Sequence, residues 1–181
     1  MNRSHFLLVL LGIGVFTAAG AAPPGDLPSC VRGAFVGITE TDPNGVILGH
    51  PDTRDWGCIG QKNNGGSAGA GATRAFDVPA PLPTAVCFEP AAPNPASGAT
   101  RLQFALPATA HVGVVIYGRN AGHGSPDVFV ARTLVDGIRA PGFYTVTWDL
   151  TDEAGARVAR GIYRCVLDVG GDVLCGDVEV R

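Results

Sequence analysis

The second half of the chain consists of short apolar runs separated by turn-forming residues. The runs are rich in β-branched and aromatic residues, are bounded by Gly, Pro, Asp or Asn, and cover 102–106, 112–117, 128–134, 143–148, 162–169 and 173–180. Runs of this length and composition are typical of β-strands. No window of helical length carries an apolar stripe with a 3.6-residue period. The pattern predicts an all-β protein whose C-terminal part is an antiparallel β-sandwich.

Gly170-Gly171 separates the last two runs and suits a two-residue hairpin turn of the primed type. This turn places Cys165 opposite Gly176. The side chains on one face of the hairpin are then apolar, namely Tyr163, Cys165, Leu167, Leu174 and Val178. The side chains on the other face are mostly charged, namely Arg164, Asp168, Asp177 and Glu179. Cys165 should therefore point into the core as a buried free thiol, whereas Cys175 should point outward.

Residues 22–84 differ in composition from the second half, because they contain many glycines and prolines and only one pattern typical of a hairpin. The hairpin would pair 34–39 with 46–48 around the turn 41–45, which reads Thr-Asp-Pro-Asn-Gly. Segment 60–72 is rich in Gly and Ser, can bury almost nothing and is typical of a flexible linker. We expect this N-terminal region to have little core of its own.

The first residues have the order of a secretory signal peptide. Arg3 precedes an apolar run from Phe6 to Ala19, and small residues follow up to Ala21, after which we expect cleavage. The apolar run falls short of the about 20 residues that a transmembrane helix needs, so no membrane span should remain after cleavage. The chain is then expected to divide into a signal peptide (1–21), the Gly/Pro-rich N-terminal region with its hairpin and linker (22–84), and the sandwich domain (85–181).

Composition and cysteine content narrow the function classes. The formal net charge of −3 gives no electrostatic footprint for nucleic-acid binding. The five cysteines stand at 30, 58, 87, 165 and 175, and no CxxC spacing indicates zinc or thioredoxin-type chemistry. In an exported chain such cysteines are first interpreted as disulfide partners. We therefore expect a secreted, periplasmic or cell-surface protein.

A series of short motifs in the second half occurs in a family-like order: Pro93-Asn94-Pro95, Leu106-Pro107, Val114 to Tyr117, Arg132 to Gly137, Pro141-Gly142, Val146 to Asp149, Asp152 to Gly155, Val158-Ala159 and Gly161 to Tyr163. The series, over about 87–181, resembles the Ig-like domain of flagellar hook-capping proteins and the C-terminal sorting domains of type nine secretion substrates. One departure is an insertion at 118–126, where the family has a short turn.

The resemblance implies an Ig-like antiparallel sandwich that serves assembly, attachment or sorting and has no catalytic residues. It also implies that the segment of Cys87 runs beside the last strand, which favours a Cys87–Cys175 disulfide. Cys30 would then pair with Cys58 and hold the N-terminal region together. The four disulfide cysteines would be Cys30, Cys58, Cys87 and Cys175.

Three chemical signals in the N-terminal region have simpler structural explanations. Residues 65–69 read Gly-Gly-Ser-Ala-Gly, but the strand and helix that flank a nucleophile elbow are not predicted there. His50 and Asp52 could supply two metal ligands, but spacing places no third. Acidic and amide side chains could bind calcium, but they lack the regular loop spacing and suit turns instead: Asp42, Asn44, Asp52 and Asp55. We assign no catalytic, cofactor-binding or metal-binding residue.

The insertion between the second and third runs is the candidate recognition loop, because binding residues are often carried on loops. Its polar side chains are Arg119, Asn120, His123, Ser125 and Asp127.

Taken with the resemblance, the sequence predicts an exported, non-enzymatic bacterial protein that binds another protein or a cell-envelope component. In a narrower version, the sandwich is a sorting address that is cleaved near Ala85. The alternative is a small secreted enzyme or ligand-binding protein, with its site in residues 30–80 and the sandwich as carrier.

Overall fold

The structure is a computed structural model, and it describes Cys30 and residues 40–41, 47–48, 56–59, 82–119 and 128–181. Within these residues two four-stranded antiparallel sheets face each other, and no helix occurs. The all-β class predicted from the apolar runs is confirmed for this part of the chain.

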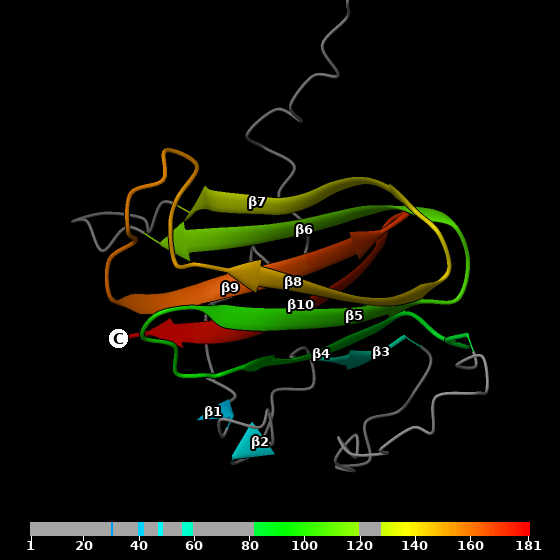
Figure 1. Ribbon diagram of the computed structural model, residues 1–181, viewed down its shortest axis with the longest axis horizontal. Helices are drawn as coiled ribbons and strands as arrows, with labels where there is room; N and C mark the ends of the chain where they lie inside the picture. The colour runs from blue at the N-terminus through cyan, green and yellow to red at the C-terminus, as the bar shows by residue number, and fades with distance from the viewer. Residues whose placement is uncertain (1–29, 31–39, 42–46, 49–55, 60–81, 120–127) are drawn as a thin grey trace, which may run out of the picture.

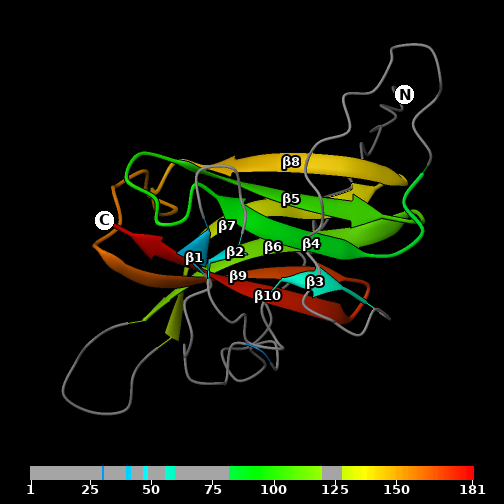
Figure 2. The same ribbon diagram turned by 90° about the horizontal axis from the view of Figure 1, so that it is seen from below.

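The first sheet has the order β10-β9-β6-β7 and is formed by β6 (Ala110–Arg119), β7 (Val128–Arg139), β9 (Gly161–Val169) and β10 (Asp172–Val180). The second has the order β3-β4-β5-β8 and is formed by β3 (Gly57–Cys58), β4 (Cys87–Ala92), β5 (Thr100–Leu106) and β8 (Gly142–Trp148). Figure 1 shows the strands of both sheets running along the long axis, and Figure 2 shows β4, β5 and β8 in one layer and β9 and β10 in the other.

Every predicted strand of the second half is present, and two further strands, β3 and β4, were not predicted. β4 contains Pro90, and its pairing with β5 is irregular between Glu89 and Ala92, which hides the strand pattern. β7 extends to Arg139, beyond its predicted end, because Gly137 pairs with Val112 instead of forming a turn.

The β9–β10 hairpin has the predicted register, with Cys165 paired to Gly176. Gly170 and Gly171 form its two-residue connection with φ angles of 61° and 100°, which are the positive values that a type I′ turn requires. Cys165 is fully buried and carries no disulfide, where the hairpin register placed it.

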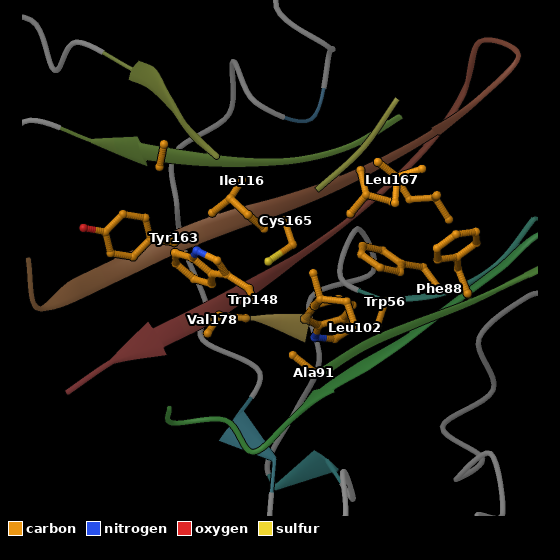
Figure 3. Packing of buried hydrophobic residues seen from close by; sticks show 14 of the residues in the cluster. Trp56, Phe88, Ala91, Leu102, Ile116, Trp148, Tyr163, Cys165, Leu167 and Val178 are labelled. Atoms are coloured by element: carbon orange, nitrogen blue, oxygen red, sulfur yellow. The ribbon is translucent and has the colours of Figure 1, made fainter. Parts of the chain in front are cut away.

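The core lies between the two sheets and is built from their inward-facing aromatic and aliphatic side chains (Figure 3). Trp148, fully buried, meets Tyr163 edge-on at 5.3 Å between ring centroids. Its indole N–H donates to the Thr151 carbonyl at 3.0 Å, so the buried polar atom has a partner. Trp148 is therefore the central core aromatic of the sandwich.

The N-terminal region contributes Trp56 to this core. The Trp56 ring lies directly on Gly176, where any β-carbon would collide with it, and meets Phe88 edge-on at 4.8 Å. The Trp56 backbone N–H donates to the Cys175 carbonyl at 2.6 Å. This segment thus bridges β10 of the first sheet and β4 of the second.

Beyond Trp56, the edge of β10 is bordered by the segment that follows β4. The Asn94 side chain donates to the Asp177 carbonyl at 2.8 Å and accepts from the Glu179 N–H at 2.9 Å. The Ala96 N–H donates to the Glu179 carbonyl at 2.7 Å. These hydrogen bonds give partners to some backbone N–H and C=O groups on the edge of β10, which could otherwise pair with a strand of another chain.

A hairpin is present in the N-terminal region, and its second strand lies within the predicted range 46–48. β1 (Glu40–Thr41) pairs with β2 (Ile47–Leu48), Glu40 opposite Leu48 and Thr41 opposite Ile47. The predicted first strand, 34–39, falls outside the described residues.

Candidate functional site

The first sheet has a hollow of about 350 Å³ on its outer face, turned away from the second sheet. We call it the outer groove and define it by its lining residues: His111, Gly113, Val115, Tyr117, Val166, Asp168, Gly170 and Gly171. These residues come from β6, from β9 and from the β9–β10 turn. Their positions follow from the alternation of side chains along each strand.

The floor of the groove is formed by paired positions of β6 and β9. Val115 lies opposite Val166, and Gly113 lies opposite Asp168. A β-carbon added to Gly113 would meet the Asp168 β-carbon at 3.9 Å, an ordinary contact, so the missing side chain leaves open space above the strand. The result is an apolar floor with one carboxylate at its side.

One end of the groove is bordered by a small apolar cluster around Tyr117 and Val166, against which Cys30, Val128 and Val173 pack. Burial, reinforced by the nearby Asp168 carboxylate, raises the pKa of the Tyr117 hydroxyl. The hydroxyl therefore remains protonated at neutral pH.

Arg164 and Asp177 form a buried ion pair on the same outer face. Arg164 Nε and Nη2 lie 2.8 Å and 2.9 Å from the two oxygens of Asp177. Arg164 Nη1 also donates to the Cys30 carbonyl. The hairpin pattern placed both residues on the polar face, but they are buried there. Cys30 lies against this part of the sheet, where it is disulfide-bonded to Cys175 and accepts the hydrogen bond from Arg164. Cys175, expected to point outward, is buried in the same way.

The disulfide pairing expected from the family resemblance is wrong. The structure joins Cys30 to Cys175 and Cys58 to Cys87. The physical reason is the pairing of β4, which is not hydrogen-bonded to β10 but pairs with β3 and β5 in the opposite sheet. There Cys87 lies directly opposite Cys58, with 4.0 Å between their Cα atoms, and Cys30 reaches the outward side of β10 instead.

The other end of the groove opens at the end of the sandwich that carries the β9–β10 turn. The β5–β6, β7–β8 and β9–β10 connections gather there, at the right of Figure 1. His111 Nε2 lies 3.2 Å from Asp136 Oδ1, with both side chains largely exposed. Asp168 Oδ1 accepts from the Gly171 N–H at 2.9 Å, which fixes the carboxylate next to the opening.

Most side chains singled out from the sequence fall outside the described residues. Of the candidate recognition loop, the structure describes Arg119, the exposed last residue of β6. The others lie outside: Asn120, His123, Ser125 and Asp127, together with Asp42, Asn44, His50, Asp52, Asp55 and the segment 65–69.

Within the described residues, no group of three or more His, Cys, Asp or Glu side chains could hold a metal ion. The same part of the chain contains no helix long and apolar enough to cross a membrane.

The outer groove was not singled out from the sequence, although a signal for it existed. Val115 and Tyr117 alternate with Val112, Val114 and Ile116, so β6 carries apolar side chains on both faces. A sandwich strand needs apolar residues only on its inner face, and apolar residues on the outer face indicate that something covers it or binds to it.

Comparison with known proteins adds little to this picture. No family model matches the chain, and no curated protein matches it. Among solved structures, it is similar to the alkylpurine DNA glycosylase AlkC of Pseudomonas fluorescens bound to DNA containing an abasic-site analogue. The similarity has 22% sequence identity and a TM-score of 0.30, and covers 47% of this chain and 26% of the glycosylase chain. A likeness this weak carries no argument about function.

Proposed function

We propose that the chain is an exported, non-enzymatic binding module whose Ig-like sandwich mediates attachment or assembly at a bacterial cell surface. The partner would be a protein or another component of the cell envelope, and the outer groove is the contact surface that we favour. The observation that carries the proposal is the Cys30–Cys175 disulfide, which ties the N-terminal region to the outer face of the sandwich.

The two disulfides support the exported location. Disulfides persist in oxidising compartments and are rare where thioredoxin and glutathione keep thiols reduced. Both disulfides of the described part involve the N-terminal region, Cys30 in one and Cys58 in the other. They are therefore consistent with the signal peptide expected at 1–21.

The order of strands supports the Ig-like type. In Ig sandwiches the strands B and E are neighbours in one sheet, and the strands C and F are neighbours in the other. Here β5 and β8 are neighbours in the second sheet, and β6 and β9 in the first. The order β10-β9-β6-β7 also corresponds to the Ig order G-F-C-C′.

Tyr163 supplies a second argument for the Ig-like type. It lies near the start of β9, the counterpart of strand F, and its hydroxyl donates to the Ala159 carbonyl at 2.9 Å, four residues upstream. A tyrosine in this place with this backward hydrogen bond resembles the tyrosine corner of Ig-like domains and supports this part of the proposal.

The export part of the proposal is tested by fractionating cells of the organism that encodes the chain. The wild-type protein should be recovered outside the cytosol, with an N-terminus at Ala22 and the mass deficit of two disulfides. A variant that lacks residues 2–21 should remain in the cytosol with reduced cysteines. Recovery of the wild-type chain in the cytosol with reduced cysteines would overturn the proposal.

The attachment part is tested with purified, fluorescently labelled mature protein. It should bind to washed cells of the same organism in a saturable way, and unlabelled protein should displace it. Binding that neither saturates nor is displaced would contradict a specific attachment role.

A further inference from the structure

We propose that the outer groove binds a Lys or Arg side chain from an extended segment of a partner protein. The inference rests on the proposed function, because it names the chemistry by which the same surface would recognise its partner. The argument uses the charge, the apolar floor and the length of the groove.

The charge of the groove favours a cation. Asp168 is the one carboxylate among the lining residues, and its Oδ1 is held at the opening by the Gly171 N–H. Arg164 on the same face is already bound by both oxygens of Asp177. An anionic group brought to Asp168 would be repelled, and a neutral apolar group would desolvate the carboxylate without replacing its hydration.

The floor of the groove suits the aliphatic part of such a side chain. Val115, Val166 and the Tyr117 ring provide apolar surface leading away from Asp168. Lys and Arg bury their methylene stems along apolar surfaces and keep the charged head at a polar site.

The length of the groove favours a peptide segment over a small cation. The lining positions Gly113, Val115 and Tyr117 alternate along β6, and span about 13 Å in an extended strand. This length corresponds to about four residues of an extended peptide. A partner segment can therefore place its cation near Asp168 while neighbouring apolar side chains lie over the valines.

Gly113 allows the groove to be filled without disturbing the fold. It has no positive φ, and an added β-carbon meets only Asp168, at ordinary contact distance. Gly113→Val should therefore preserve the sheet while occupying the floor. Asp168→Asn keeps the Oδ1 acceptor for the Gly171 N–H and removes only the charge.

The test is an NMR titration of the disulfide-bonded chain with three probes. The first is the capped peptide acetyl-Val-Arg-Val-Gly-amide, the second is the same peptide with uncharged citrulline in place of arginine, and the third is butylguanidinium. The arginine peptide should shift the backbone amides of Gly113, Val115, Val166 and Asp168. It should bind about tenfold more tightly than either of the other probes, a difference that one charge-assisted hydrogen bond can supply.

The variants separate the charge from the shape of the groove. Asp168→Asn should weaken binding of the arginine peptide about tenfold, to the level of the citrulline peptide. Gly113→Val should weaken the binding of both the arginine peptide and the citrulline peptide. Asp172→Asn removes one charge from an exposed neighbour outside the lining and should leave binding unchanged. Unchanged amide spectra away from the groove verify that each variant is folded.

Four results would overturn the inference. Equal affinity for the arginine and citrulline peptides would remove the role of charge. Equal affinity for butylguanidinium and the arginine peptide would make the groove a site for small cations. No shift of the groove amides at millimolar peptide would exclude peptide binding there. If the wild-type protein and Asp168→Asn still bind equally to cells, the inference fails while the attachment function stands.

Discussion

The two outer faces of the sandwich differ in what their alternating positions carry. On the second sheet the outward residues are mostly polar and exposed, as in the pair Gln103 and Thr145, whose side chains are hydrogen-bonded at 3.2 Å. On the first sheet the outward positions of β6 and β9 include Val115, Tyr117 and Val166. The second sheet faces solvent, whereas the first is partly covered by Cys30 and partly hollowed into the outer groove.

The two faces differ in how their polar side chains find hydrogen-bond and charge partners. The solvated face needs no specific partner, because water satisfies its side chains. The covered face has buried an arginine and an aspartate, whose charges are compensated by their mutual ion pair, and the arginine also donates to the Cys30 carbonyl. We therefore expect substitutions on the covered face to cost far more stability than matched substitutions on the solvated face.

The largest effect is expected from Asp177→Ala. The substitution leaves the buried Arg164 guanidinium without its carboxylate and should lower the free energy of unfolding by about 3–5 kcal/mol. Urea denaturation measures the change. Gln103→Ala on the solvated face is the control and should change the stability by less than about 0.5 kcal/mol. Similar losses in the two variants would show that the faces do not differ as described.

Cys30→Ser tests the disulfide that holds Cys30 against the outer face of the first sheet. Removing the Cys30–Cys175 disulfide should lower the free energy of unfolding by about 2–4 kcal/mol, because the bond closes a long loop. Non-reducing peptide mapping of the wild-type chain checks the pairing first. A linked peptide containing Cys30 and Cys58 would contradict the Cys30–Cys175 pairing. An unchanged melting temperature in Cys30→Ser would show that this disulfide contributes little to stability.

Gly176→Ala tests the contact of the N-terminal region with the core. The added methyl group would collide with the Trp56 ring, and the strain should cost about 1–3 kcal/mol of stability. Trp56→Ala combined with Gly176→Ala should show a smaller cost from the glycine substitution than the single variant does. Additive effects in this double-mutant cycle would exclude a direct contact.

The smallest effect concerns alkaline pH. Since the folded state raises the pKa of Tyr117 above its ordinary value of 10.0, the folded chain holds this proton more tightly than the unfolded chain. The contribution is fully present below the unfolded pKa and is lost as pH rises toward the folded pKa. Tyr117→Phe should therefore lose less stability between pH 9 and pH 11 than the wild type. Parallel pH curves would contradict the burial of this hydroxyl.

The features that were predictable from the sequence are those set by local residues. The Gly170-Gly171 turn fixes the register of the β9–β10 hairpin, and the register fixes the inward direction of Cys165. Each step depends on residues close in the sequence and on the period-two alternation of a strand.

The features that were missed depend on contacts between distant segments. The partner of Cys87 depends on which sheet β4 joins, and Pro90 together with the irregular pairing hides β4 itself. Trp56 reaches the core from a segment without a strand pattern of useful length, since β3 has only two residues. The burial of Arg164 depends on its contacts with Asp177 and with Cys30, which is 134 positions away in the sequence.

The Cys30–Cys175 disulfide also constrains the order in which the chain can mature. Its two cysteines are 145 positions apart, whereas Cys58 and Cys87 are separated by 29. Because synthesis runs from the N-terminus to the C-terminus, Cys30 emerges long before Cys175, and both Cys58 and Cys87 emerge between them. The Cys30–Cys175 bond can therefore form only after β10 has been made, whereas the Cys58–Cys87 bond can form earlier. The last strand, β10, thus carries the partner of the first cysteine in the chain.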